Sequence, residues 1–171
     1  MNEILKATQE RRSIRTATTA DLDAITGVEA QCFPPAEVAT RETFADRLKY
    51  FPSHFWLMLD GDKVISFIDG MTTDAPNLTD EMYSHAEMHN EAGKWQMIFG
   101  VCTLPEYRRK GFAGELMRRV IRDSREHGRE GLVLTCKAEM SKWHERFGFV
   151  CEGVSSSVHG GAVWYQMRIN F

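Results

Sequence analysis

One short segment places a charge run, a glycine and a helix start in an order that suits anion binding. In residues 101–117, VCTLPEYRRKGFAGELM, a strand pattern stops at Pro105 and the basic run Arg108–Lys110 leads directly into Gly111. Gly111 permits a tight turn, and the small pair Ala113–Gly114 leaves room beside the first helical turn. Unpaired N–H groups and the helix dipole favour an anion at such a helix start. The segment therefore predicts a cradle for a pyrophosphate group.

The same letters allow a plainer interpretation, in which the basic run is a solvated surface loop. Two better-known phosphate-binding motifs are not present in this segment. GxxxxGK[ST] of the Walker A loop is absent, and the first two glycines of the GxGxxG dinucleotide fingerprint are missing. From the residues alone, the anion cradle and the solvated loop both stay open.

A histidine in KWHERFGF, residues 142–149, is a second candidate for chemistry. Trp143 and Phe147 belong to the apolar stripe of a short helix that Gly148 terminates. His144 lies at the edge of that stripe, so it is either a catalyst or the polar edge of a packing helix.

Metal binding is not expected from this sequence. The four cysteines form no CxxC pair. His85 and His89 have the i, i+4 spacing of two ligands on one helix face, but HAEMH is not HExxH and no third ligand is evident.

The composition is that of one globular domain. The chain has 171 residues, of which 43% are hydrophobic and 26% charged, with a net charge of −3. We expect a tail over residues 1–11 and a single domain over residues 12–171. The charge argues against a nucleic-acid or membrane partner, and no apolar run approaches the roughly 18 residues of a membrane span. The N-terminal residues lack a signal-peptide core, so we expect a cytoplasmic protein.

The elements that must position these residues follow the order β-α-α-β-β-β-α-β-α-β-β, which indicates an α/β (α+β) domain with a mixed sheet. A long connection over residues 71–93, with a helical turn around 80–89, is typical of a functional loop. Strands are expected over residues 12–17, 55–59, 64–68, 94–103, 132–136, 149–158 and 162–169, and helices over 22–29, 37–48, 111–127 and 139–147.

Arg108-x-x-Gly111-x-Ala113 after a strand resembles the R/Q-x-x-G-x-G/A signature of the GNAT N-acetyltransferase superfamily. The element order also agrees, from about Arg12 to Phe171. The context of the signature supports the resemblance: Leu104–Tyr107 before it, an amphipathic helix after it, then Leu134–Cys136 and Phe147–Phe149. Within that superfamily the sequence is similar to the serotonin (arylalkylamine) N-acetyltransferase branch and its bacterial relatives. That closer likeness rests on EAQCFP at residues 29–34, on the cysteine of LTCK and on WHERFGF.

This resemblance implies a mixed, mostly antiparallel sheet flanked by helices and splayed between its central strands, those of Val101 and Leu132. Acetyl-CoA would lie in the splay. The strand would meet the pantetheine and the acetyl group, the loop and helix start would hold the pyrophosphate, and Arg108 would order the loop or support the phosphates. The residues at the matching positions are Val101, Cys102, Thr103, Arg108, Arg109, Lys110, Gly111, Phe112, Ala113 and Gly114.

The sequence departs from the resembling branch at its proton-transfer groups. Where that branch has an aromatic-Tyr pair, this chain has Trp143-His144, so His144 is the candidate acid or base. The strand histidines of the animal enzymes are absent from residues 96–99. Glu29 would border the acceptor pocket and bind or deprotonate a cationic amine. Phe33 and Tyr83 would line that pocket.

The implied activity is direct transfer of an acetyl group from acetyl-CoA to a primary amine, with a small amine such as an arylalkylamine or a polyamine as the first expectation. A protein or peptide N-acetyltransferase is the second. A non-catalytic acyl-CoA-binding module is the third, because the family's tyrosine and histidines are missing. Many members of the superfamily dimerise, so a homodimer stays open.

Overall fold

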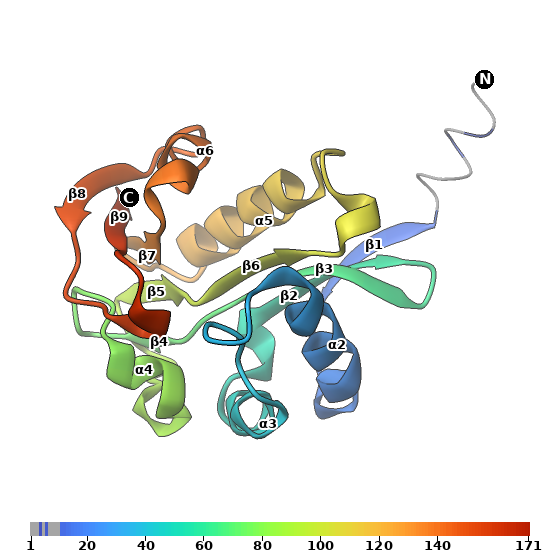
Figure 1. Cartoon of the computed structure of the whole chain (residues 1–171), viewed down its shortest axis with the longest axis horizontal. Coiled ribbons are helices and arrows are strands. Elements are labelled where there is room, and N and C mark those ends of the chain that lie inside the picture. Colours follow the sequence, from blue (N-terminus) through green and yellow to red (C-terminus); the bar gives the residue numbers. More distant parts are fainter. Residues whose placement is uncertain (1–3, 5, 7–10) are drawn as a thin grey trace.

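The computed structural model describes residues 4, 6 and 11–171, and its strands form two sheets (Figure 1). One sheet has the order β1-β2-β3-β6 and is antiparallel throughout. The other has the order β4-β5-β7-β9-β8, in which only the β5–β7 pair is parallel. The strands are β1 (Arg12–Thr16), β2 (Phe55–Asp60), β3 (Lys63–Asp69), β4 (Thr72–Thr73), β5 (Trp95–Ile98), β6 (Gly100–Thr103), β7 (Gly131–Cys136), β8 (Val150–Val154) and β9 (Tyr165–Asn170).

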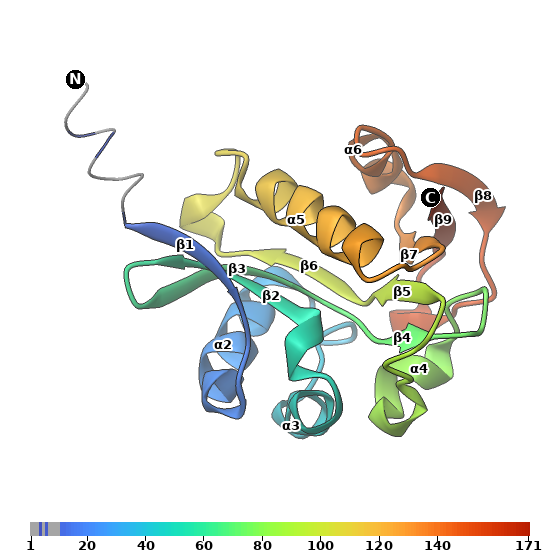
Figure 2. The ribbon, with the colours of Figure 1, turned by 180° about the vertical axis from the view of Figure 1, so that it is seen from behind.

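Helices cover both faces of the first sheet. Figures 1 and 2 show α5 on one face and α2 and α3 on the other. No helix within the described residues is both long and apolar enough to cross a membrane. The α-helices are α2 (Leu22–Cys32), α3 (Arg41–Tyr50), α4 (Asp80–Ser84), α5 (Phe112–Glu126) and α6 (Ser141–Glu145). Short 3₁₀ turns are η1 (Thr19–Asp21), η2 (Pro52–His54), η3 (Ala86–Met88), η4 (Pro105–Tyr107), η5 (Ala138–Met140) and η6 (His159–Gly161).

The expected single strand over residues 94–103 is wrong, because the chain breaks into β5 and β6 at Phe99. β5 runs parallel to β7 up to the pair Ile98–Leu134. β6 instead pairs antiparallel with β3, where Asp69 faces Gly100. The two sheets therefore part after Ile98, which confirms the expected splay between the strands of Val101 and Leu132.

The second helix begins later than expected, at Arg41 rather than Glu37. Thr40 is the reason: its side chain accepts a hydrogen bond from the Thr43 N–H at 3.2 Å, which caps the helix there. Residues 33–40 therefore form a loop between α2 and α3.

The C-terminal elements are shorter than expected. The helix expected over residues 139–147 is split into η5 and α6, and Gly148 follows with a φ of 99° as a left-handed helix stop. The strands expected over 149–158 and 162–169 shrink to β8 and β9. The tail expected over residues 1–11 falls almost wholly outside the described residues.

A cluster of phenylalanines holds α3 against the first sheet. Phe44 of α3 is fully buried, and its ring meets Phe55 and Phe67 edge-on, with centroid distances of 6.2 and 5.9 Å. Edge-to-face aromatic contacts of this kind add stability beyond the area that they bury.

We expect Phe44→Ala to lower the free energy of unfolding by about 3 to 5 kcal/mol, because it leaves a cavity between helix and sheet. Urea unfolding measures the change. Tyr50→Ala is the control on the same helix: Tyr50 is 45% exposed, so its loss should cost well under half as much. Equal losses in the two variants would contradict this assignment of the core.

Candidate active site

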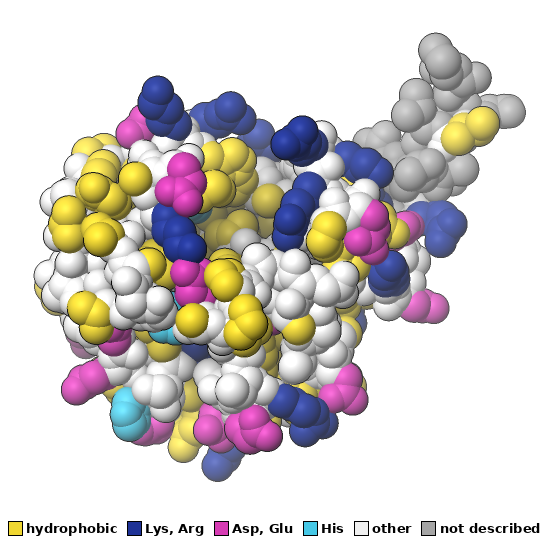
Figure 3. All heavy atoms as spheres, in the orientation of Figure 1, with side chains coloured by type: hydrophobic (Ala, Val, Ile, Leu, Met, Phe, Trp, Pro, Cys, Tyr) yellow, Lys and Arg dark blue, Asp and Glu magenta, His cyan; other side chains and the backbone are white. Residues whose placement is uncertain are grey.

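A cavity of about 1050 Å³ opens where the two sheets part. Figure 3 shows a hollow in this face of the molecule, with apolar side chains inside it and Lys and Arg side chains around it. The cavity is lined by the end of β5, by β6, by the end of β7 and by the start of α5. Loops after α2 and before β9 complete its walls.

At one end of the cavity, the loop before α5 is shaped as the sequence predicts for anion binding. Gly111 caps α5 in the left-handed conformation, with a φ of 83°, and no described atom lies within 4 Å of the place that its Cβ would take. Arg109 also has a positive φ, of 60°, which is rare for a residue with a side chain. The first intrahelical bond runs from the Glu115 N–H to the Gly111 carbonyl at 3.1 Å. The N–H groups of residues 112–114 are thus free of partners within the helix.

Most of the predicted cradle residues reach the cavity. Arg108 and Arg109 line it, as do residues 111–114. Lys110 lies outside its lining, with its ammonium group 5.6 Å from the centre of the Tyr107 ring. The ring of Phe112 is 7% exposed and packs with the core, so only its main chain is free to meet a ligand.

Arg108 orders the loop. Its Nε donates to the Thr103 carbonyl at 3.0 Å, and a second nitrogen lies 3.5 Å from the Gln31 carbonyl. This contact ties the anion-binding loop to the end of β6. Of the two roles expected for Arg108, the geometry favours loop ordering.

β6 presents a free edge to the cavity. Within the described residues it has a strand neighbour on the β3 side alone, so its other edge can offer backbone groups to a ligand. Val101 and Thr103 line the cavity, whereas Cys102 is 1% exposed and turns its thiol away. A ligand in the cavity would therefore meet the main chain of this strand, which is the contact that the resemblance implies.

Glu29 is buried beside this strand. It is 6% exposed; its Oε1 accepts the Ala39 N–H at 3.1 Å and its Oε2 accepts the Cys102 thiol at 3.1 Å. Burial raises the pKa of Glu29 above its usual range. In the described part of the chain, no cation forms an ion pair with this carboxylate. These are the properties of a carboxylate that takes up a proton more readily than an exposed glutamate does.

Asp69 and Arg47 form a buried ion pair that the sequence did not reveal. Arg47 Nη1 donates to Asp69 Oδ2 at 3.0 Å, with side-chain exposures of 5% and 1%, and Arg47 also donates to the Tyr83 carbonyl at 2.8 Å. Burial raises the pKa of Asp69 to about 7, although the guanidinium acts in the opposite direction. The available signal was Arg47 itself, which stands three residues after Phe44 on the buried stripe of α3.

Cys32 is the second group that sequence reasoning missed. It lines the cavity half-buried, with its thiol 3.3 Å from the Thr103 carbonyl. The neighbouring Cys102 thiol lowers the pKa of Cys32 to about 6, and the nearby Arg108 guanidinium acts in the same direction. The cysteine of EAQCFP is therefore a polar part of the site.

His144 lines the cavity from α6 and is 5% exposed. Its Nδ1 has no hydrogen-bond partner among the described residues, and its ring meets those of Trp143 and Phe149 at 4.9 and 5.7 Å. Burial lowers the pKa of His144 to about 4. At neutral pH the imidazole is therefore uncharged. It is suited to donating or accepting a hydrogen bond, and less suited to acting as an imidazolium acid.

The far end of the cavity is roofed by two loops. Lys137 at the end of β7 pairs with Glu37 at 2.6 Å, and the Glu37 side chain is only 7% exposed. His159 of η6 donates from Nε2 to the Glu37 carbonyl at 3.0 Å. The loop after α2 and the loop before β9 thus meet over the cavity.

The predicted acceptor residues lie under this roof. Phe33 lines the cavity half-buried. Tyr83 stacks on His159 at 5.1 Å, and its hydroxyl lies 3.2 Å from the Thr135 hydroxyl. Burial raises the pKa of Tyr83 to about 12, so the phenol stays neutral.

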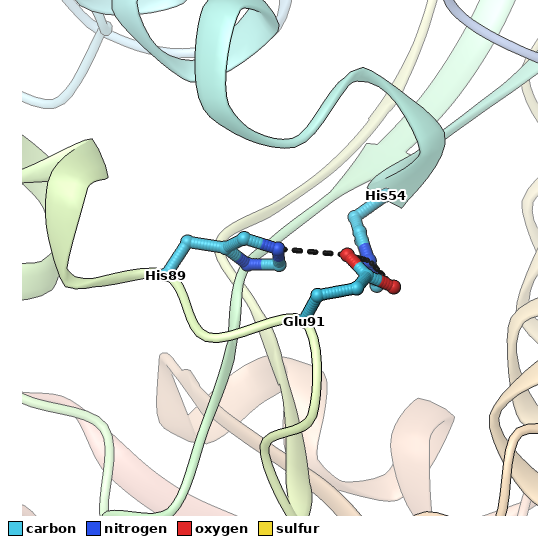
Figure 4. A group of neighbouring side chains, drawn as sticks. All are labelled: His54, His89 and Glu91. Carbon is cyan, nitrogen blue, oxygen red and sulfur yellow. Dashed lines mark hydrogen bonds and ion pairs between the residues drawn. The ribbon is translucent and has the colours of Figure 1, made fainter.

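A separate polar cluster, shown in Figure 4, joins His54, His89 and Glu91 outside this cavity. Its ligand-type atoms all lie within 4.8 Å of one another. His89 does not pair with His85, as the i, i+4 spacing suggested; His85 pairs instead with Glu87 on the surface.

Hydrogen bonds from the main chain and from Gln96 show which nitrogen atoms of this cluster donate and which accept. The Thr72 N–H donates to His89 Nδ1 at 3.1 Å, so His89 Nε2 carries the proton that it shares with Glu91. The Gln96 amide donates to main-chain carbonyls, so its oxygen accepts from His54 Nδ1. His54 Nε2 then faces the Glu91 carboxylate, 2.9 Å from its Oε2. A metal on His89 would oppose the Thr72 N–H, and Arg129 already places a cation 3.4 Å from Glu91.

Comparison with known proteins settles the family. The model of the acetyltransferase (GNAT) family matches residues 22–149, about three quarters of the chain. The chain belongs to the GNAT family of acetyltransferases. Membership makes it an N-acetyltransferase and accounts for the splayed sheets and the anion-binding loop together. A search of curated protein sequences found no match.

Solved structures share the fold at low sequence identity. The loading GNATL domain of CurA from Lyngbya majuscula superposes with a TM-score of 0.79 at 16% identity, covering 93% of this chain and 97% of that one. The GphF GNAT-like decarboxylase in complex with isobutyryl-CoA gives 0.79 at 19% identity, covering 92% and 98%. The acetyl-CoA complex of yncA from Salmonella typhimurium gives 0.68 at 15% identity, covering 93% of each chain.

We expect the acid sensitivity of the fold to depend on His144. Between pH 6.5 and 4 the unfolded chain binds a proton at this histidine that the folded chain does not, so stability falls as the pH falls through this range. Unfolding in urea at pH 7.5 and 4.5 should show that His144→Phe is spared about 2 to 3 kcal/mol of the loss in the wild type. His85→Gln, on the surface, should leave the loss unchanged. A His144→Phe protein as acid-sensitive as the wild type would contradict a buried, neutral His144.

Proposed function

We propose that this protein transfers an acetyl group from acetyl-CoA to a small primary amine. The observation that carries the proposal is the roof over the acceptor end, formed by the Glu37–Lys137 ion pair and the His159–Glu37 hydrogen bond. A peptide needs an open groove on both sides of its reacting nitrogen, whereas a small amine fits beneath a closed roof. The likeness of EAQCFP, LTCK and WHERFGF to the serotonin N-acetyltransferase branch supports the same choice.

The anion-binding end would hold the pyrophosphate of acetyl-CoA. Gly111 provides the free space, the N–H groups of residues 112–114 provide donors, and Arg109 provides charge. The free edge of β6 at Val101–Thr103 would bind the pantetheine arm and place a backbone N–H near the thioester oxygen. Acetyl-CoA bound in the yncA structure is consistent with this assignment.

Glu29 is the proposed base and His144 the proposed partner in proton transfer. An alkylammonium has a pKa near 10, by analogy with lysine, and must lose a proton before it attacks. Glu29 is buried and has a raised pKa, so it can accept that proton without facing a competing ion pair. The neutral imidazole of His144 can donate a hydrogen bond to the departing sulfur or relay a proton, since its Nδ1 is not engaged elsewhere in the described structure.

Two alternatives use the same acetyl-CoA residues. A protein or peptide N-acetyltransferase would need the roof to open into a groove. A non-catalytic acyl-CoA-binding module would bind acetyl-CoA without turnover, and the missing family tyrosine motivates it. The single domain over residues 12–171, the cytoplasmic location and the homodimer stay predictions.

The direct test is CoA release over a panel of amines, with 2-phenylethylamine, tyramine, hexylamine, 1,4-diaminobutane and spermidine beside N-terminal and lysine peptides. We expect turnover with at least one small amine and none above background with the peptides. Thermal shift with acetyl-CoA runs in parallel, because a ligand at about 100 times its dissociation constant adds roughly 2.7 kcal/mol of stability.

Each of the other outcomes would assign a different function to this protein. Turnover on peptides alone would establish a protein acetyltransferase. A thermal shift without turnover would establish the binding module. Release of carbon dioxide from a carboxyacyl-CoA, with no amine present, would point to the chemistry of a GNAT-like decarboxylase.

We expect His144→Ala to lower kcat by about 10- to 100-fold, within the range of a lost proton-transfer group, while KM for acetyl-CoA stays within twofold. His144→Tyr should restore part of the rate, because a phenol can also donate to the departing sulfur. His144→Phe keeps the shape without the donor and serves as the control. If all three variants keep the wild-type rate and pH profile, the histidine has no part in turnover.

A further inference from the structure

Two carboxyl groups come close to Gly100, at the point where the sheets part. A methyl group added to Gly100 would lie 3.3 Å from Asp69 Oδ1, 3.6 Å from Cys102 Sγ and 3.9 Å from Glu29 Oε2. Gly100, Asp69 and Glu29 all line the cavity. Carboxyl oxygens from two different elements, β3 and α2, therefore lie near each other at this point of the cavity wall.

The hydrogen bonds leave these two oxygens available. Arg47 binds the other oxygen of Asp69, Oδ2, and Oδ1 lies on the side of Gly100. The Ala39 N–H binds Glu29 Oε1, and Oε2 accepts only the weak thiol donor of Cys102. When both carboxyls are ionised, a single guanidinium faces two negative charges. One further positive charge would balance the group.

We infer that Asp69 and Glu29 together form the receptor for the ammonium group of the acceptor amine, in the cavity beside Gly100. This inference rests on the proposed function and names its acceptor class: primary amines whose nitrogen carries no further substituent. An –NH₃⁺ group offers three N–H donors to Asp69 Oδ1 and Glu29 Oε2. An N-methyl group replaces one of these donors with carbon.

The pair also provides a route for the proton. One N–H bond of the ammonium breaks and the proton passes to Glu29 Oε2, leaving a carboxylic acid and a neutral amine whose lone pair is free to attack. Asp69 keeps its contact with Arg47 and holds the nitrogen in place. Burial raises the pKa of both carboxyls, which suits a site that binds a cation and then accepts its proton.

Two variants test the receptor from different sides. Asp69→Asn keeps the shape and removes the charge, and Gly100→Ala places a methyl group against Asp69 Oδ1, which must move by a few tenths of an ångström. Gly27→Ala is the matched control, because Gly27 is exposed on α2 and no described atom lies within 4 Å of its Cβ position. Thermal melting establishes that each variant is folded. If the loss of the partner of Arg47 unfolds the Asp69→Asn variant, the KM values of the Gly100→Ala variant still test the receptor.

The measurements are steady-state KM values for 2-phenylethylamine, hexylamine and acetyl-CoA. In Asp69→Asn and Gly100→Ala we expect the amine KM to rise by about 10- to 100-fold, the range of a lost charge-assisted hydrogen bond, with KM for acetyl-CoA within twofold. Gly27→Ala should match the wild type. Wild-type enzyme should prefer 2-phenylethylamine to its N-methyl derivative, and Asp69→Asn should reduce that preference.

Failure of this inference and failure of the proposed function would give different results in these assays. Wild-type turnover with unchanged amine KM in both folded variants overturns the receptor and leaves the enzyme assignment intact. An equal rise of both KM values shows that the variants act through the fold or the acetyl-CoA site, which also overturns it. A wild type that binds acetyl-CoA but neither turns over nor binds these amines removes the proposed function, and the receptor with it.

Discussion

The parting of the two sheets at Phe99 is the constraint on which the rest of the molecule depends. Phe99 donates its N–H to the Asp69 carbonyl at 2.7 Å, while its ring packs against Tyr83 at 5.0 Å and beneath the Arg47 guanidinium at 4.7 Å. These contacts turn the chain from one sheet into the other within a single residue. β6 gains a free edge because of that turn, and the cavity opens between β6 and β7.

The same junction buries charged groups. Burial of a carboxylate is costly unless a partner compensates it, and removing the partner is more costly still. Arg47 compensates Asp69 directly, and it connects α3, β3 and α4 by donating to both Asp69 and the Tyr83 carbonyl. The fold and this wall of the cavity therefore depend on the same ion pair, and the part of the wall that Arg47 and Asp69 form cannot be rearranged without loss of the fold around it.

Local patterns in the sequence predicted the parts of this structure that depend on local forces. The amphipathic stripe of α5, the hairpin of β2 and β3, and the glycine before α5 each act within a few residues. The break at Phe99 escaped prediction because residues 94–103 form an unbroken strand-like pattern, and only β3 and β7, which are far away in the sequence, divide it. The ion pair of Asp69 and Arg47 was not predicted for the same reason, because the two residues are 22 positions apart and pair only in the folded chain. The position of His144 was predicted, but its neutral state depends on burial that no spacing reveals.

The roof over the cavity has a consequence for how such enzymes diversify. It is made of residues 33–40 and of the loop before β9, which lie outside β6 and the start of α5. Changes in length or charge within these two loops would reshape this end of the cavity and leave the loop before α5 and the free edge of β6 untouched. Under the proposed function, acceptor choice and acyl-donor binding would then be separable modules of one chain, each open to selection without the other.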